Sequence, residues 1–226
     1  EKLNDNTGDI WDSGIVKSEN SVLVSYGGKP LESRKTYYWK VKPETNKGET
    51  PWSEPATWSM AFLDKNEWKA MWTGLDKSFP KDKLEGKTRL AARYFRKEFK
   101  TDKNDISKAT LYISGLGLYQ ATINGHRIGE QVLAPTPTFY SRNIKYNTHD
   151  VTKIISEGDN AIAIALGNGR FFNLRTGHEG TRFQNHFGFP KMLLQLEIDY
   201  TDGTRQTIVS DNSWKVTADG PIVANS

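Results

Sequence analysis

The most constraining feature of this sequence is a set of short runs in which apolar and polar residues alternate, separated by turn residues. In residues 192–200, apolar side chains occupy every second position. Successive side chains of a strand point to opposite faces, so this spacing predicts strands with one buried face. No long stretch has the 3.6-residue period of an amphipathic helix. With 12% aromatic residues, 19 Gly and 9 Pro, the chain is predicted to be all-β.

Length and charge exclude several classes of protein. The 226 residues suffice for one or two domains. The formal net charge of +4 comes without any basic run, which argues against a nucleic-acid partner. No apolar stretch approaches the roughly 20 residues that span a bilayer. The chain has no Cys, so disulfides, thiolate nucleophiles and Cys-ligated metals are excluded. It begins without Met or a signal-peptide core, which indicates a processed chain or a piece of a longer one.

Residues 1–62 are predicted to form short strands of a β-sandwich. The expected strands are 10–11, 15–16, 21–24, 36–42 and 57–60. Turn sequences separate them at the spacing typical of immunoglobulin-like sandwiches. Because such sandwiches have about seven strands, we expect the missing N-terminal strands to lie upstream of Glu1.

Residues 63–88 are charged and contain Pro, as expected of a linker, and a second β domain is predicted over 89–226. Its expected strands are 93–99, 108–114, 118–123, 160–166, 192–200, 205–209 and 213–217, with at most a helical turn at 150–155. Asn124-Gly125 and Asp202-Gly203 predict hairpins with type I′ turns, which need positive φ at both central residues.

Most motifs that would carry chemistry fail on inspection. His178-Glu179 begins a zinc-protease pattern, but Arg182 stands where its second His belongs. The Gly-x-Gly pairs at 115–117 and 167–169 lack the third Gly of a dinucleotide fingerprint. Serine-hydrolase and phosphate-loop motifs are absent from the sequence. Two loop histidines, His178 and His186, are too few to predict a metal site.

Glu197 and Asp199 lie two residues apart on one face of a predicted strand, about 7 Å from each other. That distance falls within the range of glycosidase carboxylate pairs. Their face of the strand is predicted to be solvated, however. Two solvated carboxyl groups would have similar pKa values, whereas a hydrolytic acid and base need different ones. A solvated strand face is the favoured interpretation.

Residues 166–175 are the best candidate for a binding site. A strand there ends in a glycine-bounded turn that presents an amide, two guanidinium groups and two aromatic rings, a mixture suited to sugars. The candidate carbohydrate-binding residues are Asn168, Arg170, Phe171, Phe172 and Arg175. The alternative is that Phe171 and Phe172 close the end of the sandwich while the arginines are solvated. Residues 180–190 are predicted to be a long loop near the same end.

Several stretches, in the same order, resemble the N-terminal region of bacterial α-L-rhamnosidases. They are Trp11-Asp12-Ser13-Gly14, Tyr37-Tyr38-Trp39-Lys40-Val41, Pro51–Thr57, Trp68–Trp72, Ala92–Phe99, Ala109–Gly117, Ile123-Asn124-Gly125, Asp150-Val151-Thr152, Gly158-Asp159-Asn160, Leu166–Gly169 and Ser210–Lys215. Together they cover nearly the whole chain.

The resemblance implies a partial immunoglobulin- or fibronectin-III-like sandwich followed by a jelly roll related to carbohydrate-binding modules. In that family an (α/α)₆ barrel further along the chain holds the catalytic carboxylates of an inverting glycoside hydrolase. No catalytic residue therefore carries over to this chain. Some members bind rhamnose with calcium through the second domain, but many have Trp where this chain has Arg170, and no calcium ligand can be assigned.

The favoured function is therefore an accessory, non-catalytic region of an α-L-rhamnosidase that acts on rhamnose-containing glycans or glycosides. Its expected partner is the catalytic barrel, outside this chain. The alternative is a stand-alone carbohydrate-binding module for L-rhamnose or a related sugar. A third hypothesis is an adhesion or scaffold segment. The family also implies a periplasmic or extracellular location.

Overall fold

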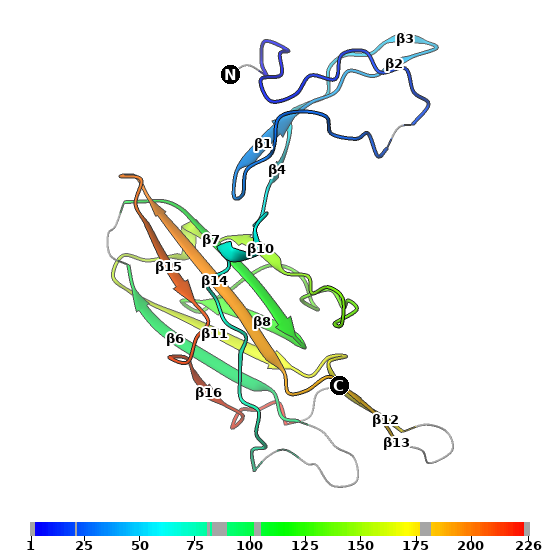
Figure 1. Cartoon of the computed structure of the whole chain (residues 1–226). Helices are drawn as coiled ribbons and strands as arrows, with labels where there is room; N and C mark the ends of the chain where they lie inside the picture. The colour runs from blue at the N-terminus through cyan, green and yellow to red at the C-terminus, as the bar shows by residue number, and fades with distance from the viewer. Residues whose placement is uncertain are drawn as a thin grey trace. The chain divides into compact units, whose positions relative to one another are not determined.

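The computed structural model describes residues 3–20, 22–80, 82, 90–101, 105–176 and 182–223, with only the backbone given for 173–176 and 182–186. The chain divides into two compact units, unit 1 over Glu1–Trp68 and unit 2 over Lys69–Ser226 (Figure 1). Both are built from β-strands, which confirms the all-β class. The three-part division predicted from the sequence, with a linker over 63–88, stays a prediction. No helix within the described residues is long and apolar enough to cross a membrane.

Unit 1 is organised around one β-hairpin. Its strands are β1 (Thr36–Trp39), β2 (Glu44–Thr45), β3 (Gly48–Glu49) and β4 (Ala56–Ser59), followed by the 3₁₀ helix η1 (Lys65–Glu67). β1 pairs with β4, and β2 pairs with β3. Tyr37 lies opposite Trp58, and their rings stack with centroids 5.7 Å apart. Such aromatic cross-strand pairs stabilise an antiparallel sheet.

The strands predicted at 10–11, 15–16 and 21–24 are wrong for the residues that the structure describes, because none of these residues pairs in a sheet. One local cause is Leu23, whose φ of 61° is incompatible with an extended strand. The strand predicted over 36–42 is shorter, and the one over 57–60 is shifted by one residue.

The end of unit 1 is held by a capped helical turn. Asp64 caps η1, and Glu67 completes the capping box by bonding back to the Asp64 backbone. Glu67 also accepts a hydrogen bond from Ser33 and pairs with Arg34. These contacts, led by the Ser33 hydrogen bond, hold the pKa of the Glu67 carboxyl below its usual range.

Unit 2 is a β-sandwich of two antiparallel sheets (Figure 1). Its elements are β5 (Thr73–Gly74), β6 (Arg93–Lys100), β7 (Ile106–Leu116), β8 (Leu118–Ile123), β9 (His126–Arg127), β10 (Asn147–Asp150), η2 (Thr152–Ile154), β11 (Asp159–Gly167), β12 (Phe172–Thr176), β13 (Arg182–His186), β14 (Lys191–Tyr200), β15 (Arg205–Val209) and β16 (Lys215–Thr217). The first sheet has the order β10-β7-β14-β15, with β5 also on β14, and the second has the order β16-β6-β11-β8-β9. β12 and β13 form a separate hairpin.

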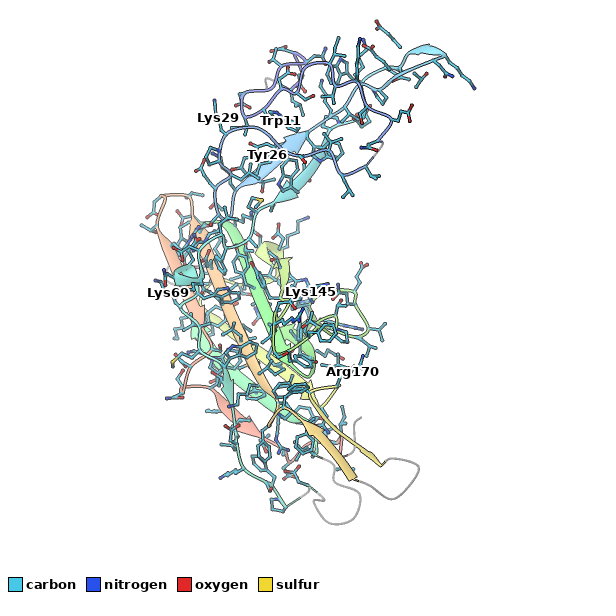
Figure 2. The ribbon with its side chains drawn as sticks, turned by 45° about the vertical axis from the view of Figure 1, so that its right-hand side comes forward. Trp11, Tyr26, Lys29, Lys69, Lys145 and Arg170 are labelled. Atoms are coloured by element: carbon cyan, nitrogen blue, oxygen red, sulfur yellow. The ribbon has the colours of Figure 1, made fainter. Side chains whose placement is uncertain are left out.

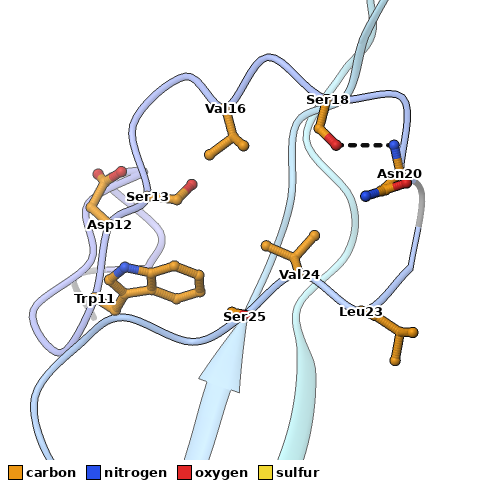
Figure 3. Close-up of a pocket in the computed structure, with 9 residues that line it drawn as sticks. All are labelled: Trp11, Asp12, Ser13, Val16, Ser18, Asn20, Leu23, Val24 and Ser25. Atoms are coloured by element: carbon orange, nitrogen blue, oxygen red, sulfur yellow. Dashed lines mark hydrogen bonds between the residues drawn. The ribbon is translucent and has the colours of Figure 1, made fainter.

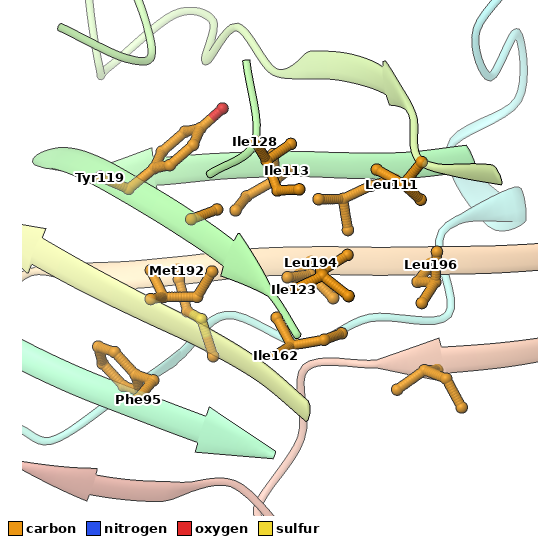
Figure 4. Packing of buried hydrophobic residues seen from close by; sticks show 14 of the residues in the cluster. Phe95, Leu111, Ile113, Tyr119, Ile123, Ile128, Ile162, Met192, Leu194 and Leu196 are labelled. Atoms are coloured by element: carbon orange, nitrogen blue, oxygen red, sulfur yellow. The ribbon is translucent and has the colours of Figure 1, made fainter. Parts of the chain in front are cut away.

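The core of unit 2 lies between these two sheets (Figure 4). Every second residue of β14 faces inward, from Met192 to Ile198, and all are fully buried. β11 contributes Ile162, Ile164 and Leu166 in the same way. The alternation seen in the sequence therefore places the apolar faces of both sheets against each other.

The outer face of β14 is also buried, contrary to the prediction of a solvated face. Gln195 and Glu197 are buried, and the side chain of Gln195 donates to Glu197. The Gln195 side-chain oxygen accepts the backbone N–H of Lys69 at 2.7 Å. Met71 bonds Ser210 through both its N–H and its carbonyl. Residues 69–71, at the start of unit 2, therefore cover polar side chains of β14 that would be exposed if the strand were isolated.

The two predicted hairpins are present, but only one has the predicted turn. Asn124 and Gly125 both have positive φ, 51° and 82°, as a type I′ turn requires. At the second hairpin Gly203 has a φ of 82°, whereas Asp202 is not in the left-handed region. Gly203 donates to Tyr200, and Tyr200 donates to Thr204. This pattern is typical of a type I turn followed by a glycine bulge.

Candidate functional site

The turn after β11 is organised by Asn168. Asn168 is buried, its side-chain amide donates to the carbonyl of Leu90 at 3.2 Å, and its own carbonyl accepts from the N–H groups of Phe171 and Phe172. Gly169 takes a φ of 49°, and its missing Cβ leaves room for the Gly117 backbone. The candidate Asn168 is therefore buried and forms hydrogen bonds that stabilise the turn.

The two candidate phenylalanines are buried in aromatic clusters. Phe171 has its ring centroid 5.1 Å from that of Tyr140 and 5.7 Å from that of Phe187. Tyr140 and Phe187 are 5.4 Å apart, so the three rings touch one another. The Phe172 ring stacks on that of Phe189. Phe171 therefore supports the exposed ring of Phe187 and is itself hidden from solvent.

Arg170 is the one candidate side chain in this turn that the structure shows in solvent. Burial raises the pKa of the Tyr140 hydroxyl, and the positive charge of Arg170 acts in the opposite direction. Arg170 and Tyr140 are therefore close enough to interact electrostatically. The side chain of the fifth candidate, Arg175, lies outside the described residues, although its backbone belongs to β12.

Two features of this site differ from what the sequence predicts. Tyr140 did not stand out, because its partners Phe171 and Phe187 lie 31 and 47 residues further along the chain. Residues 182–186 were predicted to be loop, but they form β13, which pairs with β12. The hairpin ends at Phe187, whose N–H donates to the carbonyl of Phe171. Pairing across an intervening segment has no signal in a single short window of sequence.

Glu197 and Asp199 share one cation. Arg205 Nε lies 2.5 Å from Asp199 Oδ1, and Arg205 Nη1 lies 3.1 Å from Glu197 Oε2. These contacts, led by the Asp199 hydrogen bond, raise the pKa of Arg205. Two carboxylates held by one guanidinium, one of them buried, are typical of an ion-pair network rather than of a hydrolytic acid and base.

Two cavities have linings that include no residue of this turn. The one in unit 1 has a volume of about 400 Å³ and is lined by Trp11, Asp12, Ser13, Val16, Ser18, Asn20, Leu23, Val24 and Ser25 (Figure 3). The other, of about 510 Å³, lies over the outer face of the second sheet of unit 2. Its floor is formed by Ala163 and Ala165 of β11, between side chains of β6 and β8. Neither contains a cluster of groups that could transfer protons.

Calcium prefers six to eight oxygen ligands, among them carboxylates. Across the part of the chain that the structure describes, no group of three or more His, Cys, Asp or Glu side chains is arranged to hold a metal ion. The turn after β11 supplies an amide and a guanidinium. Its described side chains therefore do not fit a calcium site.

Comparison with known proteins covers both units. The family described as "Alpha-L-rhamnosidase N-terminal domain" matches residues 104–226, and "Rha78A-like, N-terminal immunoglobulin domain" matches residues 3–64. An α-L-rhamnosidase of Formosa agariphila is 34% identical over 244 residues, which cover 100% of this chain and 25% of that protein. The chain spans about a quarter of the length of the curated relatives that match it across nearly all of its residues.

Solved structures of α-L-rhamnosidases also match both units of this chain. The α-L-rhamnosidase from Dictyoglumus thermophilum has 40% sequence identity and a TM-score of 0.81, over 100% of this chain and 25% of that one. The α-L-rhamnosidase from Aspergillus terreus has 32% identity and a TM-score of 0.75, over 92% of this chain and 24% of that one. The similarity extends through both units of the chain.

Proposed function

The chain belongs to the family of α-L-rhamnosidase N-terminal domains, and from that membership we propose that it is the accessory, non-catalytic region of an α-L-rhamnosidase. In this proposal the enzyme removes terminal α-L-rhamnose from glycans or glycosides, and its (α/α)₆ barrel lies outside this chain. The observation that carries the proposal is the match across both units to about a quarter of the length of α-L-rhamnosidases such as those of Formosa agariphila and Dictyoglumus thermophilum.

The ion pairing of Glu197 and Asp199 supports a non-catalytic role. Both carboxylates are engaged by Arg205, and the Glu197 side chain is buried. The jelly roll is proposed to pack on the barrel and to contribute to the surface on the substrate side. The same family membership supports a periplasmic or extracellular location.

Hydrolysis of p-nitrophenyl α-L-rhamnopyranoside tests this proposal. The chain alone should release no p-nitrophenol, whereas the longer gene product that includes the barrel should release it. In that longer protein, Asp199→Asn should leave kcat unchanged. Turnover by the chain alone, or a large loss of kcat in Asp199→Asn without loss of folding, would contradict the non-catalytic role.

The second candidate function is a carbohydrate-binding module for L-rhamnose or a related sugar. It is favoured by the aromatic cluster around Phe171 and the exposed Arg170 beside it. Binding sites for small ligands combine apolar surface with a few polar groups in this way. Because Phe171 is buried, its ring would act by supporting Phe187 rather than by touching the sugar.

Calorimetric titration with L-rhamnose, in calcium and then in a chelator, tests this second candidate. Saturable heat in calcium that disappears with the chelator would support a calcium-assisted module. Heat that persists with the chelator would support binding without calcium. Flat heats in both buffers, on folded protein, would leave only the accessory role. Arg170→Ala is the informative variant, since Phe171→Ala should cost about 3–5 kcal/mol of stability whatever it binds.

A further inference from the structure

Two stretches of the sequence carry the net charge of the chain. Residues 126–146 and 167–190 contain six Lys and Arg and two Asp and Glu, which equals the formal charge of +4 for the whole protein. The other residues are therefore balanced. Concentrated charge of one sign raises the local concentration of ligands of the opposite sign.

Three of the described cations of these segments, Arg142, Lys145 and Arg170, are exposed on unit 2. The N–H of Arg142 donates to the carbonyl of Phe139, so Tyr140 lies within the turn that joins Phe139 to Arg142. Lys145 follows in the same loop, and it lies on the same side of unit 2 as Arg170 (Figure 2). Among the residues that the structure describes, Arg142, Lys145 and Arg170 form no ion pair, in contrast to Lys97, Lys191 and Arg205.

The same region exposes aromatic rings. Phe187 is 60% exposed although it stacks on Phe171, so the ring turns its other side to solvent. Phe139 is 78% exposed and precedes Tyr140. Isolated exposed apolar side chains are ordinary, but adjoining ones rimmed by polar groups mark interaction sites. We call the surface formed by Phe139, Tyr140, Arg142, Lys145, Arg170 and Phe187 the loop face.

We propose that the loop face binds an acidic glycan, one whose sugars carry carboxylate or sulfate groups. The apolar faces of the sugar rings would lie against Phe187, and the acidic groups would pair with Arg170, Arg142 and Lys145. A planar guanidinium suits both anions, because its N–H groups donate to two oxygens at once. This inference rests on the proposed carbohydrate-binding function and adds the chemical class of the ligand.

Affinity electrophoresis of the whole chain tests this inference, with polygalacturonate as the carboxylate polymer, dextran sulfate as the sulfate polymer and dextran as the neutral one. At least one acidic polymer should retard the protein, and dextran should not. Which polymer does so identifies the acidic group. Raising the salt to about 0.5 M should weaken the retardation, because salt screens exposed charges.

Two variants distinguish a built site from general attraction to polyanions. Arg170→Gln should weaken binding about tenfold, the effect expected for loss of one charge-assisted hydrogen bond. Phe187→Ala should weaken it without changing the net charge, with folding checked by the melting temperature. Lys215→Gln, an exposed cation on β16, is the matched control and should bind as the unaltered protein does.

Equal effects of Arg170→Gln and Lys215→Gln, or no retardation by either acidic polymer, would overturn the inference. If L-rhamnose still gave saturable heat in the titration above, the carbohydrate-binding function would stand and only the acidic ligand would be wrong. If neither the acidic polymers nor L-rhamnose bound, the carbohydrate-binding function would fail as well. The accessory role would then be judged by its own hydrolysis assay.

Discussion

Units 1 and 2 are both formed from alternating strand sequences, yet they bury very different amounts of apolar surface. Among the described residues of unit 1, Tyr37 is the one buried apolar side chain, whereas unit 2 has a continuous core between two sheets. Large apolar side chains such as Ile15, Leu23 and Trp39 are exposed in unit 1.

The difference shows that alternation alone does not produce a core. A strand with one apolar face gains stability only when a second layer covers that face. Unit 2 has two five-stranded sheets, so each apolar face meets another. In unit 1 the described strands form only two-stranded sheets, and a lone hairpin is marginally stable in water.

The largest expected difference between the two units is the loss of stability when an ion pair is removed, because the pair in unit 2 is buried and the pair in unit 1 is exposed. In unit 2, Asp82 and Arg93 form a bidentate pair with both side chains buried. Asp82→Ala would leave the Arg93 charge buried without its carboxylate, and should cost about 3–5 kcal/mol. The matched change in unit 1, Glu49→Gln, removes an exposed pair with Lys42 and should leave the melting temperature unchanged.

Calorimetry and urea unfolding would measure both of these variants. Similar melting temperatures for Asp82→Ala and the unaltered protein would show that the buried pair does not anchor unit 2. The double variant Asp82→Ala/Arg93→Met, which removes both charges, should recover part of the loss.

The second-largest expected difference is the loss of stability when a leucine of each unit is replaced by alanine. Leu194 is fully buried in the core of unit 2, and Leu23 in unit 1 is 96% exposed. Leu194→Ala should destabilise unit 2 by about 2–5 kcal/mol, because it removes buried surface and leaves a cavity. Leu23→Ala should change stability by no more than about 0.5 kcal/mol. Urea unfolding measures both, and equal effects would contradict the difference in burial.

The smallest expected effect is a response to mild acid that is confined to unit 2. All four His of the chain lie beyond residue 68. Burial lowers the pKa of His149, so the folded state resists a proton that the unfolded chain accepts at about pH 6.5. The contribution of neutral His149 is therefore present above that pH and is lost as the pH falls toward the lowered value.

Calorimetric scans at pH 7.5, 6.5 and 5.5 should show the unit 2 transition move to lower temperature, while the unit 1 transition stays in place. His149→Gln should flatten this dependence. If the melting temperature of unit 2 depended on pH equally in His149→Gln and in the unaltered protein, another titrating group would be responsible.

Much of unit 2 could be predicted from the sequence. The seven strands expected there are present with ends shifted by at most two residues, because long alternating runs such as 192–200 specify both a strand and its buried face. The hairpin at Asn124-Gly125 was equally predictable, since those residues accept positive φ. Unit 1 was less predictable, because its runs are short and positions such as Leu23 leave the extended region.

Part of the candidate site could likewise be predicted from the sequence, and part could not. The sequence by itself determined that β11 ends in a Gly-Asn-Gly turn followed by Arg170 and two aromatic residues, because turn chemistry is local. Only the tertiary structure decided that Asn168, Phe171 and Phe172 are buried, that Tyr140 and Phe187 join Phe171, and that Arg170 stays in solvent. Burial depends on which distant segments pack over a residue, and that information is spread over the whole chain.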